Sequence, residues 1–308
     1  MASSKQEEEL EKGRTPCAGY KHGPPWVFKG SALYQLHLVK ASTARAFVPR
    51  DLRLVEAFGY TLGGMFLARY HDSPAGAFDE LVVIAGIVWN PPTSCAWAAR
   101  VLVNSVEACR HGRKEVGLPS HVATFSKTEA SALDNKPLVK SNSFLSVLGI
   151  GSSVSKQENR GEIEISETKG SSTKHLCNIS LPLTGSNNKH HKWMGPAIRM
   201  SLPSFSGQTE DHPDLLKYSC QVECRVLPVK PARIWNSGTT DTQEYSDGKM
   251  NNAGPNVLAD SDAQSQSISV LLSKPIFALE FSSLRMHVDA PKIVVPHRKK
   301  KEVGYSST

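Results

Sequence analysis

The amino-acid sequence predicts a mostly β, α+β fold: one domain built around an antiparallel β-barrel or β-cone, with a few short helices. Three observations predict this class. Strand-like segments outnumber helical ones, the helices that can be delimited are short, and strands and helices do not alternate as in βαβ proteins. With 308 residues and 39% hydrophobic content, the chain is long enough to bury a substantial core.

The expected strands are apolar runs or segments in which apolar and polar residues alternate. Within residues 31–40, Tyr34, Leu36 and Leu38 alternate with polar side chains, which is the period of a half-buried strand. Similar segments are Leu52–Phe58, Tyr60–Tyr70, Leu81–Trp89, Ala96–Val103, Lys217–Leu227 and Ile276–Val288. The pair Gly63–Gly64 inside one of them predicts a bulge or a sharp bend, as a closed sheet requires.

Two short helices have recognisable ends. Ser42 is expected to cap a helix that runs to Phe47, where a following proline disfavours further helical geometry. Ser105 is expected to cap a second helix over residues 106–116, which Gly117 ends.

Composition divides the chain into one domain with polar inserts and ends. Residues 1–15 and 297–308 are charged or polar and are expected to be disordered. The domain then covers residues 16–296, with flexible inserts expected at about 127–160 and 235–267, where Ser, Asn, Asp and Lys are frequent.

Charge and hydropathy argue against nucleic-acid binding and against a membrane-spanning helix. Lys and Arg outnumber Asp and Glu by 36 to 29, but Arg298–Lys301 account for part of this excess. No stripe of basic residues interleaved with aromatic residues crosses the apolar segments, so nucleic-acid binding is not expected. The longest apolar runs, such as Leu81–Trp89, are shorter than the roughly 20 residues of a membrane helix, so no membrane span is expected.

The N-terminus and the cysteines favour an intracellular protein without a metal or cofactor. MASSKQEEELEK lacks the apolar stretch of a signal peptide and the composition of a transit peptide, which favours a cytoplasmic location. The six cysteines are dispersed, and none of their spacings completes a zinc site. We therefore expect buried thiols, no disulfide framework, no metal and no cofactor, since Rossmann and Walker motifs are also absent.

Three longer segments carry more specific information: PPWVFKGSALYQLHLVK (24–40), HDSPAGAFDELVVIAGIVWNPP (71–92) and HGRKEVGLPSH (111–121). Their arrangement resembles the acetoacetate decarboxylase-like superfamily. The phrases GSALYQLHLVKASTARAF, HGRKEVGLPS and WMGPAIRMSLPSFSG are similar to one branch of it, the plant neoxanthin-deficient proteins. The resemblance covers roughly residues 17–126 and 190–290 and implies an acetoacetate decarboxylase-like barrel.

The resemblance also implies which chemistry is missing. The decarboxylases of the superfamily use a Schiff-base lysine and a second lysine after the proline that Pro119 matches, whereas this chain has Ser120 and His121 there. Their acid is retained as Glu80. The candidate pocket therefore comprises Glu80, Arg113, Pro119, Ser120 and His121, and no catalytic residue is assigned.

Three functions remain open at this point. The resemblance implies an accessory, ligand-binding pseudoenzyme required to form the xanthophyll neoxanthin from violaxanthin, with a small apolar or oxygenated ligand and proteins of xanthophyll synthesis as partners. The alternative is a non-decarboxylating enzyme that uses Glu80 and His121 as acid and base on a small oxygenated or lipid-like substrate. A third is a structural partner that binds through the polar loop or tail. The implied pathway favours plastid association, although no transit peptide is evident, and the oligomeric state stays open.

Overall fold

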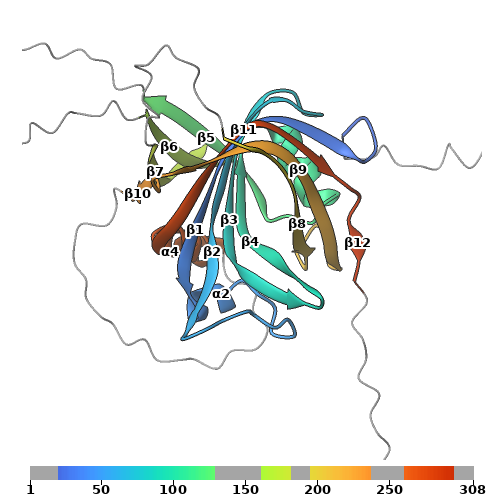
Figure 1. Ribbon diagram of the computed structural model, residues 1–308, viewed down its shortest axis with the longest axis vertical. Helices are drawn as coiled ribbons and strands as arrows, with labels where there is room; N and C mark the ends of the chain where they lie inside the picture. The colour runs from blue at the N-terminus through green and yellow to red at the C-terminus, as the bar shows by residue number, and fades with distance from the viewer. Residues whose placement is uncertain (1–19, 129–160, 182–194, 237–259, 295–308) are drawn as a thin grey trace, which may run out of the picture.

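The computed structural model describes residues 20–128, 161–181, 195–236 and 260–294. Strands dominate this part of the chain (Figure 1). The strands are β1 (Trp26–Lys40), β2 (Tyr60–Asp72), β3 (Phe78–Asn90), β4 (Thr93–Val103), β5 (Ser120–Thr128), β6 (Gly161–Lys169), β7 (Ser172–Leu181), β8 (Ala197–Gly207), β9 (Leu215–Val229), β10 (Arg233–Trp235), β11 (Lys274–Val288) and β12 (Lys292–Ile293). The helices are α2 (Ala41–Arg45), α3 (Val106–Lys114) and α4 (Asp260–Leu271).

Seven strands close into a barrel. They follow the order β4-β3-β2-β1-β11-β9-β8, and β8 returns to β4 through the parallel pairs Ala96↔Ser204 and Trp97↔Phe205. All other pairs around this ring are antiparallel. The predicted mostly β barrel is thus confirmed, and the β4–β8 contact makes it a mixed barrel.

A second, smaller sheet branches from the barrel at β4. The first half of β4 contacts β8, whereas its second half pairs in parallel with β5, from Val101↔Ser120 to Val103↔Val122. From β5 the sheet continues antiparallel through β6, β7 and β10, at upper left in Figure 1. Strand β4 therefore belongs to both sheets.

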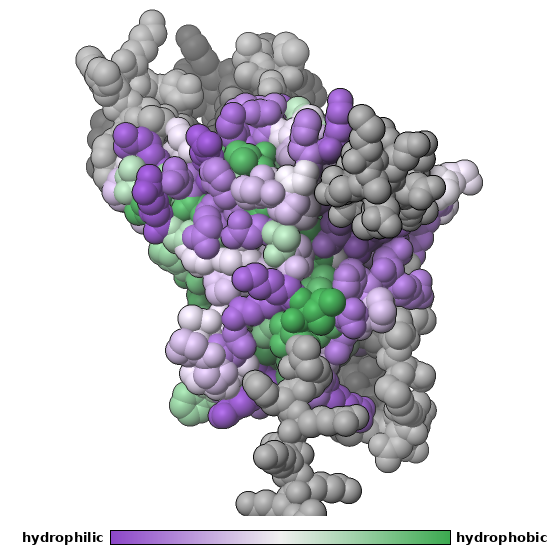
Figure 2. All heavy atoms as spheres, turned by 90° about the vertical axis from the view of Figure 1, so that its right-hand side faces the viewer, coloured by the Kyte–Doolittle hydropathy of each residue, from purple (hydrophilic) through white to green (hydrophobic). Residues whose placement is uncertain are grey.

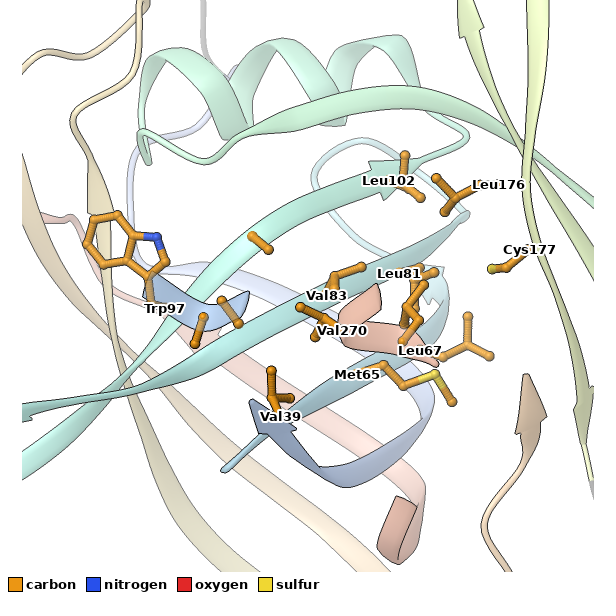
Figure 3. Packing of buried hydrophobic residues seen from close by; sticks show 14 of the residues in the cluster. Val39, Met65, Leu67, Leu81, Val83, Trp97, Leu102, Leu176, Cys177 and Val270 are labelled. Carbon is orange, nitrogen blue, oxygen red and sulfur yellow. The ribbon is translucent and has the colours of Figure 1, made fainter. Parts of the chain in front are cut away.

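Strands β1 to β4 separate two apolar cores because alternate side chains point to opposite faces of a sheet. One core fills part of the barrel and includes Phe66 and Val101. The other lies outside the barrel, where β6, β7, α2 and α4 cover the sheet. Figure 3 shows this second core, with side chains of β1 to β4 facing Val270 of α4 and Leu176 of β7.

Several expected elements differ in the structure. Leu52–Phe58 is not a strand, because its pairing consists of two isolated bridges, Leu54 with Val88 and Ala57 with Tyr60, and not of a continuous ladder. The apolar patterns of the sequence do not predict strands β5 to β8. Helix α4 begins at Asp260, inside the stretch 235–267 that was expected to be flexible.

Other expectations concern residues outside the described ranges. The predicted disordered ends, 1–15 and 297–308, lie there, as do most of the insert at 127–160 and the first part of the insert at 235–267.

Within the described ranges, no helix is both long and apolar enough to cross a membrane.

The face at right in Figure 1, which carries β8, β9 and β12, is largely hydrophilic, and Figure 2 shows apolar side chains gathered in its lower half. Ile293 of β12 is 61% exposed.

Candidate functional site: an apolar cavity in the barrel

The barrel encloses a cavity of about 260 Å³ with a largely apolar and aromatic wall. Its aromatic lining includes Phe28, Tyr34, Phe66, Tyr70, Phe78 and Tyr218. The polar lining includes Glu80, His111 and Ser120, and no lysine is among the described residues that line the cavity. A concave apolar site with a few convergent polar groups is typical of small-ligand binding.

One wall of the cavity follows β3 and β4 along most of their length. The cross-strand pairs that line it are Glu80↔Val103, Val82↔Val101, Ile84↔Ala98 and Ile87↔Ala96. Apart from Glu80, all of these side chains are apolar. The small alanines of β4 leave open space beside the larger residues of β3.

Glu80 and Tyr70 form a polar pair in this apolar lining. The Tyr70 hydroxyl donates a hydrogen bond of 2.9 Å to Glu80 Oε2. Burial raises the pKa of Glu80 to about 7, although the Tyr70 hydrogen bond acts in the opposite direction. Burial and the neighbouring Glu80 also hold the pKa of Tyr70 well above its ordinary value, so Tyr70 stays protonated and serves as a donor. Near neutral pH, Glu80 can therefore either donate or accept a hydrogen bond.

His111 is a second polar group in the cavity lining. Its Nδ1 accepts the backbone N–H of Tyr20 at 3.1 Å, and the Tyr20 ring stacks on it with 3.6 Å between ring centroids. Burial lowers the pKa of His111 to about 4, so the ring is neutral at pH 7. With Nδ1 accepting, the ring proton lies on Nε2, and this buried atom has no hydrogen-bond partner among the described residues. His111 thus offers an unused donor at the cavity.

Ser120 lies at the start of β5 and contacts α3 closely. Its side chain is buried, and an added Cβ at Gly112 would approach Ser120 Oγ to 2.6 Å. A side chain at this position would force the Ser120 hydroxyl to move, so glycine eases the close packing of the helix on the strand. The structure thus brings Glu80 and Ser120, both expected from the sequence, to one cavity.

Two other candidate residues near α3, Arg113 and Pro119, lie outside the cavity lining. Arg113 forms an ion pair with Asp211, and its side chain is 41% exposed. Neither Arg113 nor Pro119 is among the described residues that line the cavity. The Pro119 carbonyl accepts the N–H of Val101 at 3.0 Å, which fixes the start of the β4–β5 pairing. Lys114 is exposed on α3.

His121 points to the opposite face of the sheet from Ser120, because neighbouring residues of a strand alternate in direction. Its Nδ1 lies 3.1 Å from Glu167 Oε1, and Glu167 binds Arg100 at 2.7 Å. Burial lowers the pKa of His121, although Glu167 acts in the opposite direction. Burial would raise the pKa of Glu167, but hydrogen bonds from His121 and Arg100 bring it to about 2. His121 therefore belongs to a buried ionic network between the two sheets.

Sequence reasoning missed His111. A signal existed, because His111 lies three residues after Ala108 in the helix that Ser105 caps, and this spacing places both on one helical face. Both residues are buried. A histidine on the apolar face of a short amphipathic helix therefore marks the cavity better than the charged residues around it.

No protein-family model matches the chain. Among solved structures, an acetoacetate decarboxylase superposes with a TM-score of 0.51 at 10% identity, over 95% of this chain and 99% of that one. The acetoacetate decarboxylase of Legionella pneumophila subsp. pneumophila gives a TM-score of 0.50 at 12% identity, over 94% and 95% of the two chains. At these identities the likeness concerns the fold alone. The chain is a protein of the acetoacetate decarboxylase-like fold.

Similarity to curated proteins identifies the family of this chain within the fold class. The chain is 77% identical over 308 residues to Protein NEOXANTHIN-DEFICIENT 1 of Oryza sativa subsp. japonica, covering 100% of both chains. It is 56% identical to the protein of the same name from Solanum lycopersicum, over 92% of this chain and 97% of that one. The Arabidopsis thaliana protein is 54% identical over 94% and 100%. This chain belongs to the Neoxanthin-deficient 1 family.

Proposed function

We propose that this protein is an accessory, ligand-binding factor required to form neoxanthin from violaxanthin, and that its barrel binds an elongated apolar ligand by an oxygenated end. The names of the full-length relatives support the role in neoxanthin synthesis. The observation that carries the ligand class is the cavity, with its apolar β3–β4 wall and the polar groups Glu80, Tyr70 and His111.

The polar groups fit a hydroxyl or epoxide oxygen. His111 Nε2–H can donate to such an oxygen, and Glu80 can accept from a hydroxyl or, when protonated, donate to an ether oxygen. Pairing these groups with a ligand removes the cost of leaving a buried donor unsatisfied. A hydrocarbon without oxygen would leave that cost in place.

The ligand class can be tested with purified protein and three carotenoid probes: violaxanthin, neoxanthin and oxygen-free β-carotene. After gel filtration, the protein should retain both xanthophylls in preference to β-carotene. Ala98→Phe should fill the space beside Ile84 and weaken xanthophyll retention by about tenfold or more, since a filled cavity excludes the ligand. Lys114→Ala, on the exposed side of α3, is the matched control and should bind as wild type. Equal retention of all three probes, or unchanged binding by Ala98→Phe, would contradict the ligand assignment.

The physiological role can be tested in a plant that lacks the protein. Wild type and Lys114→Ala should restore neoxanthin at equal protein levels. Glu80→Leu, which removes the donor and acceptor of the carboxyl, and Ala98→Phe should not. His121→Ala is a second comparison, because this side chain lies on the far face of β5 and reaches Glu167 instead of the cavity. Full restoration by both cavity variants would place the function on another surface.

An enzymatic role is the second candidate, because a carboxyl with a pKa of about 7 is suited to general acid catalysis near neutral pH. The expected partner base, His121, faces away from Glu80. The cavity histidine, His111, carries its proton on Nε2 and acts as a donor. Among the described lining residues, the arrangement thus offers donors for an oxygen and no base paired with Glu80, which favours binding. Conversion of violaxanthin by the purified protein, lost in Glu80→Gln, would favour the enzyme instead.

A further inference from the structure

The turn between the segment 53–57 and β2 places an aromatic residue where geometry and packing both disfavour it. Ala57 and Tyr60 exchange backbone hydrogen bonds of 2.9 and 3.0 Å, so Phe58 and Gly59 form a two-residue hairpin turn. Both have positive φ, 52° and 79°. Asn-Gly is the preferred pair for this turn, and a bulky residue at positive φ is strained. Phe58 is nevertheless fully exposed to solvent.

Phe58 is part of a cluster that we call the rim: Val55, Phe58, Tyr60, Leu62 and Trp89. Apart from Phe58, its members are 41% to 45% exposed. Two segments form it. The N–H of Val55 donates to the Ile87 carbonyl and the N–H of Trp89 donates to the Arg53 carbonyl, each at 2.7 Å. The rim is therefore held together by backbone pairing at one end of the barrel.

The rim continues the apolar wall of the cavity. Trp89 lies two residues beyond Ile87 and pairs with Ser94, and both Ile87 and Ser94 line the cavity. From Glu80 to Trp89 the β3 wall spans roughly 25–30 Å of strand. Leu62, opposite Leu38, belongs to the same end of the sheet. An apolar ligand that enters past the rim meets no polar side chain on β3 before Glu80.

Several basic residues lie close to the rim residues in the sequence. Between residues 40 and 62 the charged side chains are Lys40, Arg45, Arg50 and Arg53 against Asp51 and Glu56, which is four positive and two negative charges. All six residues are exposed. Arg45 lies 3.9 Å from Glu56, so one pair is partly neutralised. Lys274, opposite Leu38 in β1, adds a positive charge at this end of the barrel.

We infer that the rim docks this protein on an anionic lipid bilayer, with Phe58 and Trp89 in the headgroup region and the basic residues on lipid phosphates. Aromatic side chains with exposed edges favour the membrane interface, and Lys and Arg near the surface are attracted to anionic lipids. The full exposure of a strained Phe58 indicates an environment other than water. This surface is separate from the cavity polar groups, so it stands whether or not the cavity binds a xanthophyll.

The test is flotation of the full-length protein with vesicles. Wild type should float with phosphatidylcholine vesicles that contain 30 mol% phosphatidylglycerol and bind less to pure phosphatidylcholine. Binding to the anionic vesicles should fall as salt rises, because salt screens the basic residues. Arg50→Ser with Arg53→Ser should weaken binding by about tenfold or more, since each basic residue near an anionic surface contributes about fivefold.

Phe58→Asn separates docking from folding. Asn suits positive φ, so the variant should be at least as resistant to urea as wild type, while vesicle binding falls about tenfold through the loss of an inserted aromatic ring. Ile293→Asn is the matched control, because Ile293 is also a large exposed apolar residue but lies in β12. It should float as wild type.

Three outcomes would overturn the inference. They are absence of flotation with the anionic vesicles, wild-type binding by Phe58→Asn, and loss of binding in Ile293→Asn with none in Phe58→Asn. If sedimentation instead shows that Phe58→Asn abolishes a dimer and vesicles bind neither form, the rim is an interface between copies of the chain.

Discussion

Glu80 and His111 are ionisable groups whose neutral forms are favoured by burial. The pKa of Glu80 is raised from 4.5 to about 7, and that of His111 is lowered from 6.5 to about 4. The raised Glu80 pKa gives stability that is present below pH 4.5 and lost as pH rises through about 7. The lowered His111 pKa gives stability that is present above pH 6.5 and lost as pH falls through about 4. Between about pH 4.5 and 6.5, the Glu80 contribution to stability falls as pH rises, while the His111 contribution grows. The two changes therefore largely cancel.

Replacing Glu80 by Gln should remove the Glu80 contribution and leave the His111 contribution alone. At pH 5 the variant should have nearly the same free energy of unfolding as wild type, because Gln resembles the protonated carboxyl. At pH 8 it should be more stable, by up to about 3 kcal/mol, since the ionised carboxylate is no longer held in the cavity. Urea unfolding at the two pH values measures the difference.

Glu164→Gln is the control for that experiment, because Glu164 is exposed on β6 and its loss should change stability little at either pH. A Glu80→Gln variant that is destabilised by the same amount at pH 5 and pH 8 would contradict a raised Glu80 pKa.

Glu167→Gln should have the opposite effect at neutral pH. Glu167 and Arg100 are almost fully buried, and the carboxylate also binds His121. Removing its charge leaves a buried guanidinium without its carboxylate, which should cost about 3–5 kcal/mol of unfolding free energy at pH 7. Because the pKa of Glu167 is lowered to about 2, this contribution should disappear as pH falls from 4.5 toward 2. If Glu167→Gln has the same free energy of unfolding as wild type at pH 7, the network contributes no stability.

At the scale of elements, Gly64 lets β1 and β2 approach closely. Its φ is 134°, and an added Cβ would clash with the Gln35 carbonyl of β1. Gly76 also has a positive φ, 77°, but has open space around it. In urea unfolding, Gly64→Ala should therefore cost at least about 3 kcal/mol, whereas Gly76→Ala should cost about 1 kcal/mol. Equal costs would mean that backbone strain, and not the contact with β1, determines the requirement for glycine.

The elements that could be predicted are those with a local signal. Strand β1 alternates apolar and polar residues along much of its length, and Ser105 caps α3 by accepting the N–H of Ala108, as expected for a serine directly before a predicted helix. Strand β8, by contrast, contains Pro203 among serines and resembles a loop in composition. Helix α4 is mostly polar, and the apolar residues by which it packs on the core, Ile268, Val270 and Leu271, all lie near its end.

The candidate site could be predicted only in part, for a similar reason. Glu80 begins a strongly apolar strand and stands out in the sequence. Ser120 and His121 are neighbours, and the sequence alone cannot decide which of them faces the cavity. That choice depends on the parallel register with β4, where Ser120 lies opposite Val101, a contact between segments joined by α3.

At the scale of the whole molecule, β1 to β4 serve two cores with different polar chemistry. On the outer face, two buried polar side chains of β1 and β4 are paired: Gln35 binds the Ala232 backbone, and Arg100 binds Glu167. On the barrel face, His111 Nε2 has no partner among the described residues. The outer face therefore holds the second sheet and α4 in place, while the inner face keeps hydrogen-bonding capacity for a ligand.

The pairing of β1 with β11 has a consequence for synthesis of the chain. Strand β1 lies between β2 and β11, and roughly 230 residues separate Lys40 from Lys274. At about 5–20 residues per second, one edge of β1 waits roughly 10–50 s for its partner to leave the ribosome. An unpaired strand edge beside apolar side chains is a template for pairing with other chains. A chain cut before Lys274 thus lacks the strand that covers this edge of β1, and the nascent chain exposes the same edge for most of its translation.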